Sequence, residues 1–351
     1  MTQVATEAKE RTKSSIEELE FDPHAPLLEV EDLHVEFRTR AGVVKANDGV
    51  SYTLGEGETM AIVGESGSGK TVSAQAVMGI IDSPPGYITK GAARFRGVDL
   101  LALPEDERRA FRGEKMAMIF QDALSALNPL FRVGWQIAEM YRQHRGTSKA
   151  EARKKAIELL DRVRIPAARD RVDSYPHEFS GGMRQRAMIA MALALDPEVL
   201  IADEPTTALD VTVQAQIMKL LADLQSETGM GMILITHDLA VVAEVTNRAA
   251  VMYAGRIVEQ GTTKEIFKTS YHPYTLGLMN SIATPAQKGT KLIPIPGSPP
   301  DLLHLPSGCP FHPRCVFAQA ICSEDRPPLR DLGNGRKSAC HFAEEVGAGA
   351  K

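Results

Sequence analysis

Residues 64–71 (GESGSGKT) constrain the fold of this chain more than any other stretch of its sequence. They follow an apolar run at residues 60–63 and precede residues 72–81, which predict a helix. Glycines allow backbone conformations that a Cβ would forbid, so several N–H groups and the start of the helix can converge on phosphate oxygens. In a G-x-x-x-x-G-K-[ST] pattern the lysine contacts the β- and γ-phosphates, and the hydroxyl that follows ligates Mg²⁺. The sequence therefore predicts a nucleotide site formed by Gly64, Ser66, Gly67, Ser68, Gly69, Lys70 and Thr71.

The bulk composition is typical of a soluble globular protein, with 43% hydrophobic and 24% charged residues. A net charge of −5 gives no electrostatic reason to expect nucleic acid as a partner. The sequence holds no apolar run near the ~18 residues of a membrane span, and its first residues lack the apolar region of a signal peptide. We therefore expect a cytoplasmic protein.

The first part of the chain divides into a tail and a segment of strands. Residues 1–26 are polar and charged and predict a flexible tail. Residues 27–54 alternate apolar and polar side chains, which predicts an antiparallel β-subdomain. Phe37 in this segment has two interpretations, a core aromatic residue or a platform on which an adenine ring stacks.

Predicted strands and helices alternate over residues 60–240. This pattern predicts an α/β fold whose mostly parallel sheet binds ligands at the carboxyl ends of its strands. Amphipathic patterns at residues 133–145 and 149–164 predict helices, and we place them in a helical subdomain of about residues 122–185. Two short apolar runs within residues 249–259, joined at Ala254-Gly255, predict a hairpin.

Polar residues directly follow three of the apolar runs. Gln121 follows one predicted strand, the pair Asp203-Glu204 follows the next, and His237 follows a third. Asp203 at a strand end suits a Mg²⁺ contact, and Glu204 beside it suits a base that polarises water. Gln121 can ligate Mg²⁺ or contact a neighbouring segment.

A second candidate anion site lies at Ser180-Gly181-Gly182. Ser180 suits the N-cap of the Ala-, Met- and Leu-rich helix that follows, and the two glycines leave the start of that helix uncovered. Free N–H donors and the positive end of the helix dipole then face an anion.

Together these motifs resemble the nucleotide-binding subunit of an ATP-binding cassette (ABC) transporter. The residues that carry the resemblance are, in order, the phosphate loop at 64–71, Gln121, the signature at 179–186 (FSGGMRQR), Asp203-Glu204, Asp210 and His237. The signature is absent from other phosphate-loop NTPases. It departs from many members only at Phe179 and Met183, where leucine and glutamine are usual. The implied fold, over residues 27–265, is a RecA-like core sheet with an antiparallel β-subdomain and a helical subdomain.

The resemblance also implies how these residues act. Two cassettes would form paired half-sites, with ATP between the phosphate loop of one and Ser180-Gly181-Gly182 of the other. It implies that Glu204 is the base for the attacking water, that His237 contacts the γ-phosphate and that Gln121 senses it. Asp210 would join the two sites across the interface, and Thr71, Gln121 and Asp203 would hold Mg²⁺.

The C-terminal extension (residues 266–351) resembles that of the ATPases of oligopeptide and dipeptide importers, a subfamily that also handles nickel complexes, and the dipeptide type is the most similar. The motifs lie at residues 271–275, 294–300 and 309–315. The implied partners are two transmembrane permeases, a second homologous ATPase that would form a heterodimer with this chain, and an external solute-binding protein. The chain would then lie on the cytoplasmic face of the membrane. Peptide, nickel chelate and another small solute remain alternatives, because substrate choice belongs to those partners.

Two other classes of protein share a phosphate loop. A soluble ABC ATPase that remodels nucleic acid or ribosomes is the alternative within the family, but such proteins usually carry two cassettes or a long coiled-coil insertion, and neither is present in this sequence. A kinase or GTPase is disfavoured by the signature and by His237.

The four cysteines lie in the last part of the chain with the spacing C-x5-C-x6-C-x17-C. Four thiolates can hold Zn²⁺ or an iron–sulfur cluster, and spacing separates these poorly. The resemblance implies a [4Fe–4S] cluster, which we favour over Zn²⁺. Disulfides or free thiols are the remaining interpretation. The predicted ligands are Cys309, Cys315, Cys322 and Cys340.

Overall fold

The computed structural model describes residues 19–207, 209–281 and 294–349. The chain divides into two compact units. The first comprises residues 1–28, 55–58 and 95–233, and the second comprises residues 29–54, 59–94 and 234–351. The predicted domain limits at 26 and 265 stay predictions, and most of the predicted tail lies outside the described residues.

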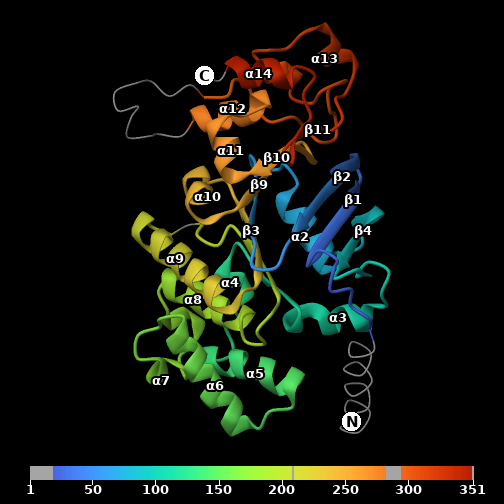
Figure 1. Ribbon diagram of the computed structural model, residues 1–351. Coiled ribbons are helices and arrows are strands. Elements are labelled where there is room, and N and C mark those ends of the chain that lie inside the picture. The colour runs from blue at the N-terminus through green and yellow to red at the C-terminus, as the bar shows by residue number, and fades with distance from the viewer. Residues whose placement is uncertain (1–18, 208, 282–293, 350–351) are drawn as a thin grey trace. The chain divides into compact units, whose positions relative to one another are not determined.

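In the second unit, three neighbouring strands of one sheet follow the order β2-β1-β4. They are β1 (Leu28–Thr39), β2 (Gly42–Leu54) and β4 (Gly86–Phe95). Alternate side chains of β1 are buried, among them Leu33 and Val35, as the sequence pattern predicted. Figure 1 shows these strands lying side by side.

The second sheet of this unit carries the phosphate loop. Its strands follow the order β11-β12-β10-β9-β3, and β3 pairs in parallel with β9 while the other pairs are antiparallel. The predicted hairpin is confirmed as β9 and β10, joined at Ala254-Gly255. The strands are β3 (Thr59–Val63), β9 (Arg248–Tyr253), β10 (Arg256–Thr262), β11 (Arg330–Gly333) and β12 (Arg336–Ser338). The C-terminal extension therefore adds two strands to the edge of this sheet.

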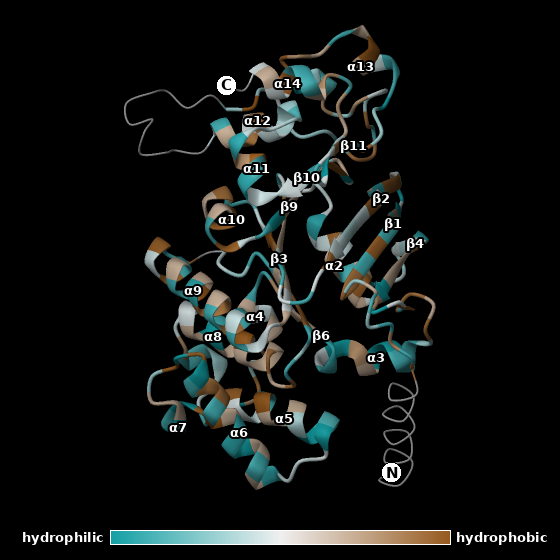
Figure 2. Ribbon diagram, viewed as in Figure 1, coloured by the Kyte–Doolittle hydropathy of each residue, from teal (hydrophilic) through white to brown (hydrophobic). Residues whose placement is uncertain are grey.

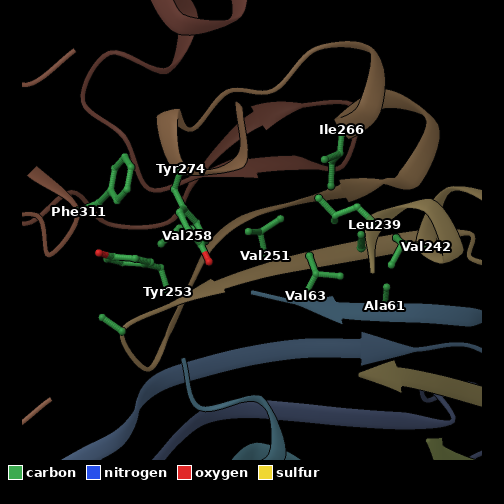
Figure 3. Packing of buried hydrophobic residues seen from close by; sticks show 12 residues of the cluster. Ala61, Val63, Leu239, Val242, Val251, Tyr253, Val258, Ile266, Tyr274 and Phe311 are labelled. Carbon is green, nitrogen blue, oxygen red and sulfur yellow. The ribbon is translucent and has the colours of Figure 1, made fainter. Parts of the chain in front are cut away.

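Short helices complete the second unit. They are α2 (Lys70–Met78), α10 (Leu239–Val245), α11 (Thr263–Lys268), α12 (Pro273–Asn280), η3 (His312–Arg314), α13 (Ala320–Glu324) and α14 (Ala343–Gly349). Apolar side chains of α10, α11 and α12 pack with those of β3, β9 and β10 in one core (Figure 3). Members of this core include Val63, Val251, Val242, Ile266, Tyr274 and Phe311. Burial of this apolar area stabilises the contact between the extension and the sheet.

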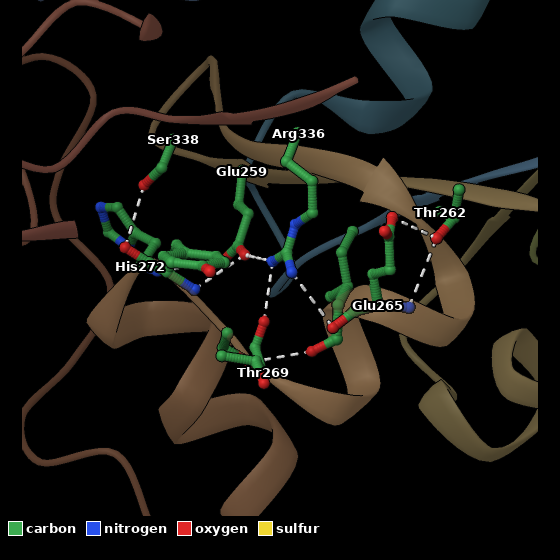
Figure 4. A network of polar contacts seen from close by, with 10 residues as sticks. Glu259, Thr262, Glu265, Thr269, His272, Arg336 and Ser338 are labelled. Carbon is green, nitrogen blue, oxygen red and sulfur yellow. Dashed lines mark hydrogen bonds and ion pairs between the residues drawn. The ribbon is translucent and has the colours of Figure 1, made fainter. Parts of the chain in front are cut away.

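A buried polar network joins β12 to β10 and to the helices after it (Figure 4). Glu259 is fully buried, and its carboxylate accepts hydrogen bonds from Arg336 Nη2 at 2.7 Å and from the backbone N–H groups of Tyr271 and His272 at 2.8 and 3.0 Å. Arg336 also donates to the carbonyl oxygens of Thr269 and Glu265. Each buried charge thus has several partners, as burial requires.

In the first unit, β6 (Met116–Ile119) pairs in parallel with β7 (Val199–Asp203). Strand β8 (Gly231–Thr236), whose first three residues belong to this unit, lies next to β7. The remaining elements are β5 (Val98–Asp99), α3 (Glu105–Glu114), α4 (Ala123–Ala126), α5 (Val133–Arg145), α6 (Lys149–Arg162), α7 (Ala168–Arg171), η1 (Pro176–Glu178), α8 (Gly181–Ala192) and α9 (Val211–Thr228).

The two predicted amphipathic helices are confirmed as α5 and α6, the second ending at Arg162 rather than Arg164. Gly146 ends α5 with φ 63°, and the Ser148 hydroxyl starts α6 by accepting the Glu151 N–H. Figure 2 shows hydrophilic and hydrophobic residues mixed along both helices. No helix in the described ranges is long and apolar enough to cross a membrane.

Candidate nucleotide site

The phosphate loop joins β3 to α2 and has no room for side chains at two of its glycines. Gly69 caps α2 with φ 99°, and a Cβ there would lie 2.3 Å from the Ala46 carbonyl oxygen. A Cβ on Gly64 would lie 2.2 Å from the Met252 carbonyl oxygen. Non-bonded atoms do not approach so closely, so both positions require glycine. Neighbouring backbone therefore fixes the path of the loop.

Two polar side chains of the loop, those of Lys70 and Ser68, are buried. Lys70 is buried, and its Nζ donates to the carbonyl oxygens of Gly64 at 2.8 Å and Glu65 at 3.0 Å. Among the described residues, no group hydrogen-bonds to the buried Oγ of Ser68. Ser66 and Gly67 are exposed and Thr71 is half-buried at the start of α2. A cradle of this shape, with a lysine and a buried hydroxyl, fits a chain of phosphates.

Two residues outside the motif donate hydrogen bonds to the backbone of the loop. Asn47 Nδ2 donates to the Gly69 carbonyl oxygen at 3.0 Å, and the Gly255 N–H donates to the Ser68 carbonyl oxygen at 3.0 Å. Phe37 on β1 is only half-buried and lies outside the buried core, so the core interpretation of this residue loses support. Its stacking on adenine stays a prediction. His237 follows β8 in the same unit and is exposed.

The first unit brings Gln121 and Glu204 together. Asp203 ends β7 and is buried, while Glu204 after it has φ 43°. The Glu204 carboxylate accepts hydrogen bonds from Thr207 Oγ1 at 2.7 Å and from Gln121 Nε2 at 3.2 Å. A left-handed conformation at a glutamate costs on the order of 1 kcal/mol, so the fold around this residue must impose it. Strained backbone conformations that the surrounding fold imposes are common at functional sites.

The signature motif also lies in the first unit. Ser180 caps α8 by accepting the Met183 N–H at 3.3 Å, so the predicted N-cap is confirmed. Ser180 and Gly181 are exposed, which leaves the start of α8 open to an anion. A Cβ on Gly182 would come within 2.8 Å of the Val213 side chain. Asp210 caps α9 by accepting the Val213 N–H at 3.0 Å and is itself exposed.

The predicted cluster in the extension requires a correction. The four cysteines are free thiols and line one cavity together with Phe311 and His312, but no group of three or more His, Cys, Asp or Glu residues in the described ranges could hold a metal ion. Burial raises the pKa of Cys315 to about 11 and that of Cys340 to about 12. The prediction of a [4Fe–4S] cluster is therefore wrong, and the zinc and disulfide alternatives have no support.

Sequence reasoning missed several residues that contact the candidate site. Thr207 binds Glu204, Asn47 binds the phosphate loop, and Arg314 and Tyr274 both hydrogen-bond to Glu65. Thr207 lies only three residues after Glu204, so its position offered a signal. Arg314 lies 249 residues from Glu65, and no local pattern links the two.

Comparison with known families and proteins identifies the class of this chain. Residues 47–207 match the family described as ABC transporter, and residues 258–322 match the family described as oligopeptide/dipeptide transporter, C-terminal region. A putative peptide import ATP-binding protein of Brucella abortus (strain 2308) is 51% identical over 92% of this chain and 99% of its own length. The oligopeptide transport ATP-binding protein OppD of Salmonella typhimurium is 52% identical over 91% of this chain and 94% of its own.

Solved structures agree with this assignment. A dimeric ATP-binding cassette in a post-hydrolysis state, bound to ADP and phosphate, superimposes with a TM-score of 0.61 at 27% identity and covers 67% of this chain and 98% of its own. The cbiO1 protein of Clostridium perfringens, part of an ABC transporter complex, gives 0.58 at 30% identity, covering 69% of this chain and 90% of its own. The chain therefore belongs to the ATP-binding subunits of oligopeptide/dipeptide ABC transporters and is an ABC-type ATPase.

Proposed function

We propose that this ATPase powers the uptake of peptides through membrane permeases. The observation that carries the proposal is a phosphate loop of the required shape in a chain that is about half identical, over most of its length, to proteins named for peptide import. The partners would be two transmembrane permeases, a second homologous ATPase and a solute-binding protein outside the membrane. The subunit would then lie at the cytoplasmic face of the membrane as a peripheral protein. A role on nucleic acid finds no support in a net charge of −5.

We infer that the loop at 64–71 binds the phosphates of ATP. The tight backbone and the buried Ser68 hydroxyl support this assignment. Lys70 Nζ would exchange its bonds with the loop's own carbonyl oxygens for bonds to the phosphates. Thr71, Gln121 and Asp203 carry the oxygen donors that Mg²⁺ prefers, and the bound ion would neutralise charge on the phosphates. Phe37 would stack on the adenine ring, and His237 would contact the γ-phosphate.

Glu204 is the proposed base for the attacking water. Its carboxylate is held by Thr207 and Gln121, so one of its oxygens is oriented before any substrate arrives. An oriented carboxylate next to a buried strand end suits proton abstraction from water. Gln121, which we expect to sense the γ-phosphate, thus hydrogen-bonds directly to the proposed base.

The exposed starts of α8 and α9 support a composite site. Ser180 and Gly181 are exposed, and so is Asp210, although each of the two capping side chains already accepts a backbone N–H of its own helix. We propose that a second cassette covers them, with Ser180-Gly181-Gly182 completing the partner's ATP site. ATP binding would close the cassette dimer and hydrolysis would open it.

The test is Glu204→Gln in the full-length chain assembled with its permeases. We expect kcat for ATP to fall by about 10²–10⁴-fold while MgATP binding is retained, because the amide cannot accept the proton. Glu227→Gln is the matched control, since it makes the same change on the exposed surface of α9, where Glu227 pairs with Arg162. Wild-type turnover in Glu204→Gln would refute the assignment of the base. Turnover in the assembled complex that no peptide stimulates would refute peptide import.

A further inference from the structure

The C-terminal part of the chain holds one residue of the phosphate loop at two points. Arg314, at the end of η3, donates from Nη1 to Glu65 Oε2 at 2.7 Å and from Nη2 to Glu65 Oε1 at 3.0 Å. Tyr274 on α12 accepts the backbone N–H of Glu65 through its hydroxyl at 2.8 Å. The side chain and the main chain of Glu65 are thus both fixed, although the loop pattern places no demand on this position.

The groups that hold Glu65 are themselves rigidly placed. The Arg314 side chain is 6% exposed, and its Nε donates to the Pro296 carbonyl oxygen at 2.9 Å. Tyr274 is fully buried, with its ring centroid 4.6 Å from that of Tyr253 and 5.4 Å from that of Phe311 (Figure 3). A guanidinium that makes two parallel bonds to a carboxylate fixes its geometry as well as its charge.

The contacts continue from Glu65 to Lys70. The carbonyl oxygens of Gly64 and Glu65 each accept a hydrogen bond from Lys70 Nζ. A shift of Glu65 therefore moves the groups that position the lysine. Catalytic and binding groups lose effectiveness when displaced by about 1 Å, even where the cause lies at a distance.

We propose that Arg314 and Tyr274 are positioning residues that set the phosphate loop for nucleotide, acting through Glu65. The inference rests on the proposed role of residues 64–71 in binding ATP. It makes the C-terminal extension part of the support of the nucleotide site. If Arg314 only fastened the extension to the sheet, its loss would lower thermal stability and leave nucleotide affinity unchanged.

The experiment measures MgATP binding by calorimetry to full-length Arg314→Met, Glu65→Gln and the double variant. We expect each single substitution to raise the Kd roughly tenfold, within the 5–150-fold range typical of coupled sites. The double variant should bind no more weakly than the singles, since residues that act through one contact are not additive. Arg314→Lys, which keeps the charge but not the two-pronged geometry, should fall between wild type and Arg314→Met.

Arg330→Met is the matched control. Arg330 also lies in the extension and also pairs through both Nη atoms with one glutamate, but that glutamate is Glu344 of the extension and not a residue of the loop. The Arg330→Met protein should bind MgATP with the wild-type Kd. Melting temperatures of all variants are measured alongside, so that a loss of affinity in a protein melting at the wild-type temperature supports positioning.

The outcomes separate this inference from the proposed function. Wild-type protein that fails to bind MgATP would overturn the assignment of the loop and the inference with it. Wild-type binding together with an unchanged Kd in Arg314→Met and Glu65→Gln would overturn the inference alone, as would additive losses in the double variant. If Arg314→Met does not fold, Arg314→Lys and Glu65→Gln decide the question by the same criterion.

Discussion

Replacement of Arg336 by methionine should destabilise this protein strongly. The substitution keeps most of the side-chain volume but leaves the Glu259 carboxylate without its cationic partner. The side chains of Arg336 and Glu259 are 8% and 0% exposed, so water cannot replace the lost contact. Removal of one partner from a buried, hydrogen-bonded ion pair costs about 3–5 kcal/mol. We expect Arg336→Met to lose that amount of unfolding free energy.

The pH dependence of the loss follows from Glu259. Burial raises the pKa of this carboxyl group above its ordinary value, and the bonds from Tyr271 and Arg336 oppose that rise. Without Arg336 the pKa rises further, so the folded variant holds a proton that the unfolded chain releases. An acid with a raised folded pKa contributes stability at low pH that is lost as the pH rises. The deficit of Arg336→Met should therefore be larger at pH 8 than at pH 5.

The assay is urea unfolding of the full-length chain at both pH values. Glu259→Gln combined with Arg336→Met removes both charges and should be more stable than Arg336→Met at pH 8, because no unpartnered carboxylate remains buried. The control Arg330→Met breaks an exposed pair with Glu344, which is worth only about 0–1 kcal/mol. Equal losses in Arg336→Met and Arg330→Met, or a deficit that does not grow with pH, would refute the reasoning.

Two further predictions concern backbone strain and a buried imidazole. Gly69→Ala should abolish measurable MgATP binding by calorimetry, whereas Gly67→Ala, whose Cβ meets nothing within 4 Å, should weaken it less. Burial lowers the pKa of His272 from 6.5 to about 3, so only the unfolded chain takes up this proton and stability should fall as the pH drops below 6.5. The loss is about 1.4 kcal/mol per pH unit. Urea unfolding at pH 7.5 and 5 should show that the unfolding free energy of His272→Asn depends less on pH than that of wild type.

The parts of this fold that could be predicted are those encoded by neighbours in sequence. The phosphate loop lies between a strand and a helix as its motif requires, and α5 and α6 follow their apolar periodicity. The start of α3 could also have been predicted from the sequence, because Pro104 is followed by Glu105, Asp106 and Glu107. Proline followed by acids is typical of a helix start.

The spacing of the cysteines was a weaker guide. The spacing of cysteines in a sequence does not say how the folded chain arranges them or what surrounds each thiol. Here Cys322 and Cys340 are buried beside Phe311 and Phe342, and the raised pKa values of Cys315 and Cys340 follow from desolvation. An apolar lining of this kind depends on how distant segments pack, so no count of residues between cysteines could have predicted it.

Contacts between distant segments could not be predicted, because the sequence allows too many pairs of oppositely charged residues. With 40 Lys and Arg and 45 Asp and Glu in the chain, nothing in the sequence selects Arg314 as the partner of Glu65. The choice is made by the core, because Tyr253, Tyr274 and Phe311 pack against one another and place the guanidinium beside the loop. In the proposed site, the motif would specify which atoms meet the phosphates, and the packing of the extension would specify how firmly those atoms are held. Substitutions in that packing should therefore alter nucleotide affinity without touching any residue of the motif.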